Sequence, residues 1–267
     1  MTRTPATRPV TVPVTVRGTV LGAGRPKVIV PLTGGTVPAL LDQARDVVAA
    51  GPDLVEWRVD HLGPGDAAPG DAAPADVVAA GRELRAALGG LPLLVTIRTA
   101  AEGGLAAVAD ADYVAVYRAV LEAGLADLVD VEVMRDEATV RTLVDLAHAA
   151  GALVVASNHD FDATPPQEEI VRRLLHMADR GADVLKIAVM PHDPGDVLAL
   201  LAATWEASGR TERPLITMAM AGTGVASRVA GGVFGSAATF GTVGAASAPG
   251  QVELGALRAA LAVVHPG

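Results

Sequence analysis

The chain has 267 residues, a formal net charge of −9 at pH 7, 51% hydrophobic residues and no cysteine. This acidic balance argues against nucleic-acid binding, which depends on neutralising phosphates with basic residues. The lack of cysteine excludes disulfides, thiolate nucleophiles and cysteine-ligated zinc. No apolar run reaches the roughly 18 residues that a membrane-spanning helix needs. We therefore expect a soluble, cytoplasmic globular protein that does not act on membranes.

Short β-branched runs alternate with helical patterns from residue 27 onward. The helical patterns often end in glycine, as at Gly124, Gly151 and Gly181, because glycine accepts the left-handed conformation at a helix end. Short apolar runs bounded by turn residues are typical of buried parallel strands. The expected strands are Lys27–Leu32, Leu54–Val59, Pro92–Arg98, Leu128–Val133, Leu153–Ser157, Val184–Val189, Leu215–Met220 and Gly235–Gly241.

Eight such units predict an α/β protein, a single (β/α)8 TIM barrel over residues 27–267. A doubly wound open sheet is the alternative. Residues 1–26 alternate Val and Thr around prolines, which predicts an extended ribbon that caps one end of the barrel. The repeat at Gly63–Asp76 predicts a flexible loop. The segment Thr164–Gln167 predicts a helix start, with Thr164 as the N-cap and Gln167 at the capping-box position.

Ionisable residues recur at the ends of five consecutive predicted strands. In a (β/α)8 barrel the active site lies at the carboxyl-terminal ends of the strands, and alternate residues of a strand share a face. An internal ion-pair network filling the barrel mouth would also account for most of these charges. The residues are Glu56 and Arg58, Arg98 with Glu102, Asp130 and Glu132, His159, and Lys186.

Lys186 is the residue that such a network leaves unexplained. Nearly all cations of the chain are arginine, and only Lys27 and Lys186 are lysine. Lys27 opens the first strand at the far end of the barrel, where we expect a solvated charge. Lys186 lies within an apolar strand, where desolvation favours the neutral amine that a Schiff-base nucleophile needs. Arginine cannot supply this amine, because its guanidinium stays protonated.

A lysine amine and a histidine base at a barrel mouth indicate carbonyl chemistry through an iminium. His159 would move a proton on the carbon next to that iminium. The acid pair Asp130 and Glu132 could instead ligate a metal ion. No histidine lies at ligand spacing beside this pair, and Arg58 and Arg98 would neutralise it, so we expect no metal.

Six segments match the motifs of one known family, in order and at compatible spacing over residues 15–265. They are EWRVD (Glu56–Asp60), IRTAAEGG (Ile97–Gly104), SNHDFDATP (Ser157–Pro165), LKIAVMP (Leu185–Pro191), ITMAMAGTGVASR (Ile216–Arg228) and FGSAATFGTVGAASAPGQ (Phe234–Gln251). With these segments the chain resembles the type I 3-dehydroquinate dehydratases. A single segment would be weak evidence, whereas the ordered set is specific.

The resemblance implies a homodimeric barrel that needs no cofactor or metal. Its reaction would convert 3-dehydroquinate to 3-dehydroshikimate and water, the third step of the shikimate pathway to aromatic amino acids. It implies that Lys186 attacks the C3 ketone, that His159 is the general base and acid, and that Glu102 orients His159. The resemblance implies substrate contacts for Glu56, Arg58, Arg98, Arg228, Ser247 and Gln251.

One departure and two alternatives accompany this interpretation. Pro31 stands where members of the family carry a substrate-contacting serine. A class I aldolase-type barrel would also use a strand-six lysine, with Gly222–Gly224 and Gly231-Gly232 as its phosphate site, but Arg228 favours a carboxylate ligand. A sugar-acid-binding barrel that has lost its activity is the non-catalytic alternative. The presence of Lys186 together with a histidine and a glutamate at matching positions argues against it.

Overall fold

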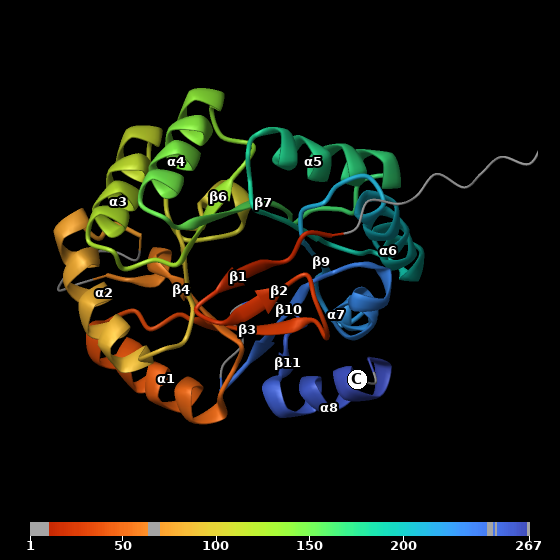
Figure 1. Cartoon of the computed structure of the whole chain (residues 1–267), viewed down its shortest axis with the longest axis horizontal. Helices are drawn as coiled ribbons and strands as arrows, with labels where there is room; N and C mark the ends of the chain where they lie inside the picture. Colours follow the sequence, from red (N-terminus) through yellow and green to blue (C-terminus); the bar gives the residue numbers. More distant parts are fainter. Residues whose placement is uncertain (1–10, 64–69, 245–247, 249, 266–267) are drawn as a thin grey trace, which may run out of the picture.

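Eight parallel strands form a closed barrel surrounded by helices in the computed structural model, which describes residues 11–63, 70–244, 248 and 250–265 (Figure 1). The sheet order is β11-β10-β3-β4-β5-β6-β7-β8-β9, and the barrel closes where the Ala237 amide donates to the Leu215 carbonyl at 2.6 Å. This sequential order confirms the predicted barrel and rejects the doubly wound sheet. The strands are β3 (Lys27–Leu32), β4 (Leu54–Arg58), β5 (Leu93–Thr96), β6 (Leu128–Glu132), β7 (Leu153–Asp160), β8 (Val184–Val189), β9 (Leu215–Ala219), β10 (Ala238–Thr242) and the short β11 (Val252–Glu253).

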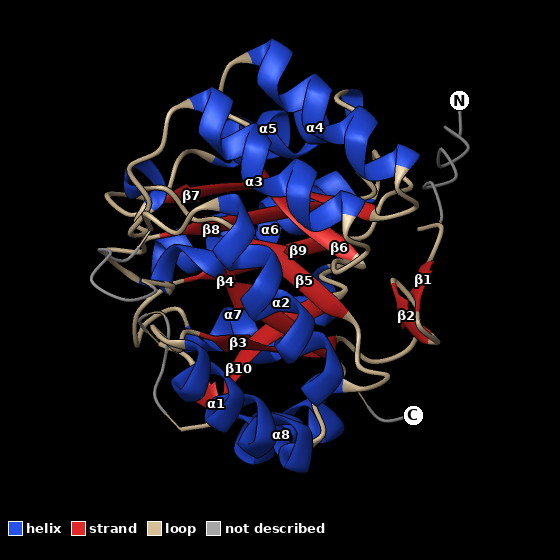
Figure 2. Cartoon of the chain, turned by 90° about the vertical axis from the view of Figure 1, so that its left-hand side faces the viewer, coloured by secondary structure: helices blue, strands red, loops and turns tan. Residues whose placement is uncertain are grey.

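The helices alternate with the strands and cover the outside of the barrel (Figure 2). Side-chain caps begin several of them: Thr36 accepts the Ala39 amide at the start of α1, and Asp193 accepts two amides at the start of α6. The helices are α1 (Val37–Ala50), α2 (Pro74–Leu88), α3 (Asp110–Glu122), α4 (Glu137–Ala149), α5 (Gln167–Asp179), α6 (Pro194–Ser208), α7 (Val225–Ala230) and α8 (Leu254–Val264), with 3-10 turns η1 (Val59–His61), η2 (Ala100–Glu102) and η3 (Gly231–Phe234).

Two local predictions about helix starts are wrong. Helix α5 begins at Gln167 after Pro166, and the Thr164 hydroxyl donates instead to the Met190 carbonyl at 3.0 Å. The Gln167 amide donates to Glu206 on α6, so it does not complete a capping box. The predicted flexible loop Gly63–Asp76 is too long, because α2 already begins at Pro74. Residues 64–69 of that loop lie outside the described residues.

The barrel interior is built in layers by strand register. The inward-facing residues near the amino-terminal ends of the strands are apolar, and the residues two positions further along each strand also point inward, nearer the mouth. This alternation carries Glu56, Thr96, Asp130, Ser157 and Lys186 into the interior above an apolar base. The base consists of Ile29, Leu54, Leu94, Leu128, Val155, Val184, Ile216 and Ala238.

The N-terminal ribbon covers the amino-terminal end of the barrel, as predicted (Figure 2). Strands β1 (Val14–Val16) and β2 (Thr19–Leu21) pair antiparallel around a turn in which Arg17 and Gly18 both have positive φ. Val16 and Leu21 are buried with the residues of the barrel base. Lys27 lies at the same end, and its ammonium donates to two backbone carbonyls at the exposed surface. The sealed end leaves the opposite end of the barrel as the mouth.

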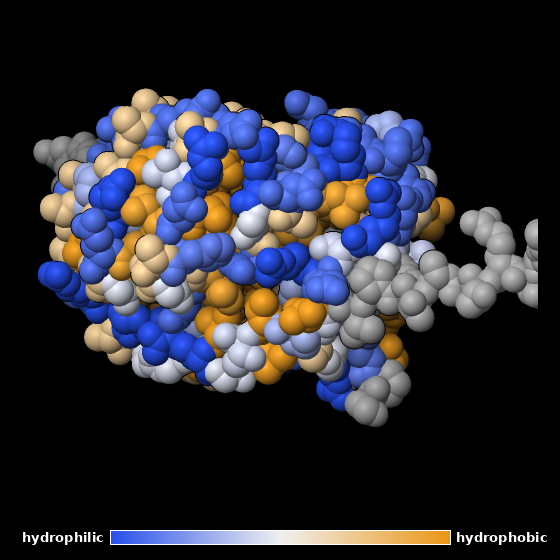
Figure 3. All heavy atoms as spheres, turned by 45° about the horizontal axis from the view of Figure 1, so that its top comes forward, coloured by the Kyte–Doolittle hydropathy of each residue, from blue (hydrophilic) through white to orange (hydrophobic). Residues whose placement is uncertain are grey.

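The outer surface mixes polar and apolar side chains over the face in Figure 3. Among the described residues, no helix is long and apolar enough to cross a membrane.

Candidate active site

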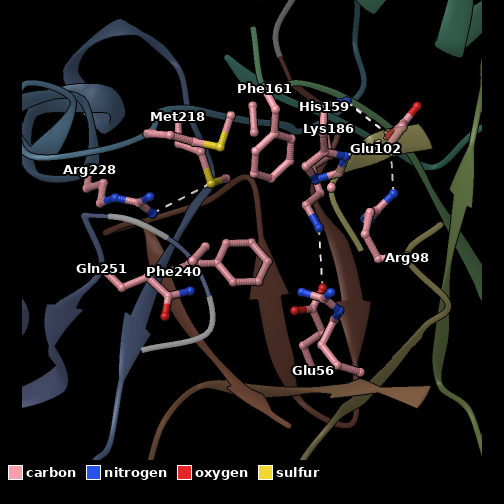
Figure 4. Close-up of a pocket in the computed structure, with 15 residues that line it drawn as sticks. Glu56, Arg98, Glu102, His159, Phe161, Lys186, Met218, Arg228, Phe240 and Gln251 are labelled. Atoms are coloured by element: carbon pink, nitrogen blue, oxygen red, sulfur yellow. Dashed lines mark hydrogen bonds and ion pairs between the residues drawn. The ribbon is translucent and has the colours of Figure 1, made fainter. Parts of the chain in front are cut away.

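A cavity of about 150 Å³ lies at the mouth of the barrel (Figure 4). Eight of the nine site residues predicted from the sequence line this cavity, and the ninth, Ser247, lies outside the described residues. The cavity is lined by Glu56, Arg58, Arg98, Glu102, Gly103, His159, Phe161, Lys186, Ala188, Met218, Met220, Arg228, Phe240, Ala248 and Gln251.

Lys186 lies at the floor of the cavity, within the otherwise apolar strand β8, and is 3% exposed. Its Nζ donates to Asp130 Oδ2 at 2.8 Å and to Glu56 Oε1 at 3.3 Å. The face of the Phe240 ring lies 4.7 Å from the same nitrogen. The sequence alone indicates the desolvation of this lysine, whereas the structure supplies two opposite charges that offset this cost.

His159 and Glu102 form a hydrogen-bonded pair at the cavity wall. His159 comes from the end of β7 and Glu102 from η2, and Nδ1 of the imidazole lies 2.8 Å from Glu102 Oε2. The same carboxylate accepts the His159 backbone amide and the Asn158 side chain. Burial, with the Arg98 and Lys186 charges, holds the pKa of His159 well below its usual range. Burial also raises the pKa of Glu102 to about 7, although Arg98 opposes this.

Arg98 is surrounded by protein carboxylates. Its guanidinium donates to Asp130 at 2.6 Å, Glu132 at 3.0 Å, Glu102 at 3.3 Å and the Ser157 hydroxyl at 3.0 Å. The acid pair considered as a metal site is therefore bound to an arginine. Among the described residues, no three side chains of metal-binding type come together to hold an ion. Asp130, for which the sequence suggested only a metal-ligand or ion-pair role, is the group that joins Arg98 to Lys186.

Arg58 is fixed by the carboxylate of Asp60, which was not predicted as a site residue. Its Nε and Nη2 each donate to one oxygen of Asp60 at 2.7 Å, in a bidentate pair. Asp60 is 1% exposed and also accepts the backbone amides of Arg98 and Leu105. The aspartate is the last residue of the EWRVD segment, so its position in that motif was the available signal.

Arg228 and Gln251 lie on the opposite wall of the cavity from Lys186 and His159 (Figure 4). Arg228 comes from α7, is 2% exposed, and lies with Nη1 3.7 Å from the sulfur of Met218. Burial lowers the pKa of Arg228 to about 10, which leaves it cationic at neutral pH. A buried cation facing an apolar wall that includes Phe240 suits an anionic ligand group.

Gly103, Phe161, Ala188 and Ala248 also line the cavity, and the sequence offered no chemical signal for them. Gly103 has φ of +76°, and a Cβ added there would lie 2.3 Å from the Phe161 ring, so the wall requires glycine at this position. Pro31 pairs in register with Glu56 and is not among the lining residues.

The fold and the cavity define a class of enzyme: a (β/α)8 barrel with a buried lysine and a histidine–glutamate pair at its mouth. A family model described as type I 3-dehydroquinase matches residues 28–267. The chain therefore belongs to the type I 3-dehydroquinase family, which confirms the resemblance seen in the sequence.

Individual relatives agree with this assignment. The chain is 50% identical to a 3-dehydroquinate dehydratase of Klebsiella pneumoniae over 236 residues, covering 88% of this chain and 92% of the relative. It is 48% identical over 244 residues to one from Listeria monocytogenes, covering 91% and 94%. A crystal structure of the type I enzyme from Clostridium difficile with covalently modified comenic acid matches with a TM-score of 0.90 at 39% identity, covering 96% and 98%.

Proposed function

We propose that this enzyme dehydrates 3-dehydroquinate to 3-dehydroshikimate through a Schiff base on Lys186, in the shikimate pathway. The observation that carries the proposal is the buried Lys186 amine on the floor of the cavity that His159 also lines. The similarity to curated 3-dehydroquinate dehydratases supports the choice of substrate. The covalent ligand of the Clostridium difficile relative supports covalent chemistry in such a site.

The chemical steps follow from the groups around the cavity. The Lys186 amine attacks the C3 ketone, and the ketone oxygen leaves as water when the iminium forms. The iminium then withdraws electrons from C2, so that a neutral imidazole can remove a C2 proton. The lowered pKa of His159 keeps it in that neutral form. The protonated His159 returns this proton to the C1 hydroxyl, which leaves as water, and hydrolysis of the iminium releases the product and Lys186.

The remaining predicted residues are assigned by their position around the cavity. The hydrogen bond that His159 Nδ1 donates to Glu102 fixes the ring and leaves Nε2 as the nitrogen that exchanges the proton. Arg228, with Gln251 beside it, binds the substrate carboxylate, because its guanidinium fork matches two oxygens. Glu56 and Arg58 face the same space and bind substrate hydroxyls.

Two further parts of the interpretation also stay proposals. The iminium supplies the electron sink of the reaction, so the chemistry as written needs neither a cofactor nor a metal. The homodimer and the substrate contacts of Arg98 and Ser247 are predictions from the family resemblance, and the cytoplasmic location is a prediction from the composition.

Borohydride reduction in the presence of 3-dehydroquinate tests the proposal. We expect a stable adduct on the peptide that contains Lys186, found by mass spectrometry, and a rise in ultraviolet absorbance from the conjugated product in the unreduced reaction. Lys186→Arg should abolish both and keep the fold, because a guanidinium cannot form the imine. Lys27→Arg, at the exposed far end of the barrel, is the matched control and should retain both. An adduct-free wild type, or an active Lys186→Arg variant, would overturn the proposal.

A further inference from the structure

Asp130 is the carboxylate in closest contact with the reacting nitrogen of Lys186. Its Oδ2 accepts a hydrogen bond from Nζ at 2.8 Å, and the residue is fully buried on β6. It is not among the residues that line the cavity, so it contacts Lys186 without facing the space that the substrate would occupy. Glu56 contacts the same nitrogen at 3.3 Å but does line the cavity, and it is therefore available to the substrate.

The Asp130 carboxylate is held in one orientation by groups that the reaction does not consume. Its Oδ1 accepts Arg98 Nη2 at 2.6 Å and the Ser157 hydroxyl at 2.5 Å. Its backbone carbonyl accepts the hydroxyl of Tyr117. Burial opposes its ionisation, but the Arg98 and Lys186 charges hold the pKa of Asp130 well below its usual range. Asp130 thus carries a fixed negative charge in the resting enzyme.

Imine formation leaves the charge of this site unchanged. The ammonium of Lys186 and a neutral ketone together give a protonated iminium and one water molecule, so Nζ carries a single positive charge both before and after condensation. One N–H bond remains on Nζ after condensation. A carboxylate 2.8 Å away that binds the ammonium is therefore also placed to accept this N–H.

We infer that Asp130 is the counter-ion of the iminium, and that it keeps the Schiff base protonated, and so electron-withdrawing, until His159 removes the C2 proton. This inference rests on the proposed Schiff-base function. Without the counter-ion, burial would favour loss of the N–H proton, and a neutral imine is a much weaker electron sink. Asp130 would then act in the proton-abstraction step without touching the substrate.

Other groups also face Lys186 and have to be separated from Asp130 in a test. They are Glu56 on β4, Arg98 after β5 and His159 on β7, with the uncharged Phe240 ring on β10. Glu132 offers a matched control, because it is 2% exposed and binds the same Arg98 without contacting Lys186.

The test measures borohydride trapping of the Lys186 adduct against pH, because borohydride reduces iminium ions much faster than neutral imines. In Asp130→Asn we expect the trapping rate to fall by up to about tenfold per pH unit once the pH exceeds the point where the imine loses its proton. Wild type, Glu132→Gln and the carboxylate-retaining Asp130→Glu should keep a flat profile over the same range. A flat profile in Asp130→Asn would overturn the counter-ion inference alone. A wild type that forms no adduct would overturn the proposed function and with it this inference.

A second measurement does not require the Asp130→Asn variant to fold. The chain has only two lysines, so enzyme labelled with ¹⁵N-lysine gives two side-chain resonances, one from exposed Lys27 and one from Lys186. With substrate and product at equilibrium, the Lys186 resonance should stay at the shift of a protonated iminium as the pH rises from neutral to about two units higher. A change to the shift of a neutral imine within that range would overturn the inference.

Discussion

Glu102 gives the folded protein a pH dependence that one substitution can isolate. Burial raises its pKa to about 7 from the ordinary 4.5, against the opposing charge of Arg98. Between pH 4.5 and about pH 7 the Glu102 carboxyl is protonated in the folded protein and ionised in the unfolded chain. The contribution of this carboxyl to stability is therefore complete below about pH 4.5 and is lost as the pH rises through 7. At 1.36 kcal/mol per pH unit, the interval corresponds to about 3 kcal/mol.

Glu102→Gln removes the titration and keeps the size of the side chain. We expect the free energy of unfolding of the wild type, relative to this variant, to fall by about 3 kcal/mol between about pH 4.5 and about pH 8. Urea denaturation at constant ionic strength measures both proteins. Glu83→Gln, at an exposed position of α2, is the control and should differ from wild type by less than about 0.5 kcal/mol at every pH. A Glu102→Gln difference that does not change with pH would refute the reasoning.

Two further substitutions test the walls of the site. Gly103→Ala forces alanine to φ of +76° and places its Cβ 2.3 Å from the Phe161 ring; we expect a loss of about 1–3 kcal/mol and a raised KM, and unchanged kinetics would contradict this. Asp60→Asn leaves the buried Arg58 without its carboxylate and should cost about 3–5 kcal/mol in urea denaturation. Asp42→Asn, whose ion pair is exposed, should cost less than about 1 kcal/mol, and equal losses would refute the argument.

The barrel could be predicted from the sequence because each strand carries its own local signal. Apolar β-branched runs and the glycines that end the helices marked all eight barrel strands. The errors lie at strand ends, where contacts with residues distant in the sequence determine how far the strand extends. Strand β7 continues past Ser157 because His159 pairs in register with Ala188, although polar residues conceal this in the sequence. Strand β10 begins at Ala238, later than predicted, because Gly235 ends η3.

The sequence could predict which residues form the candidate site but not which of these residues contact one another. Side-chain parity and the family motifs placed Lys186 and His159 at one cavity. The alternation of side chains along a strand does not show which charged residues of neighbouring strands contact each other. Asp130 and Glu132 were therefore weighed as metal ligands, although the structure joins both to Arg98. The pairing depends on the height of each side chain within the barrel, which only the register between strands fixes.

The barrel closes between β9 and β10, and these are the neighbouring barrel strands with the fewest paired residues. We call this junction the seam. The other neighbouring pairs among the eight barrel strands pair over three or more residues, whereas here Leu215 meets Ser236 in a single bridge. Sub-global opening begins where fewest hydrogen bonds must break, so amides at this seam should exchange with solvent faster than those of β6 and β7. Arg228 follows β9 and Gln251 follows β10, so the wall of the cavity spans the seam. The barrel can thus open locally at the cavity wall that carries Arg228 and Gln251 while the strands that carry Lys186 and His159 stay paired.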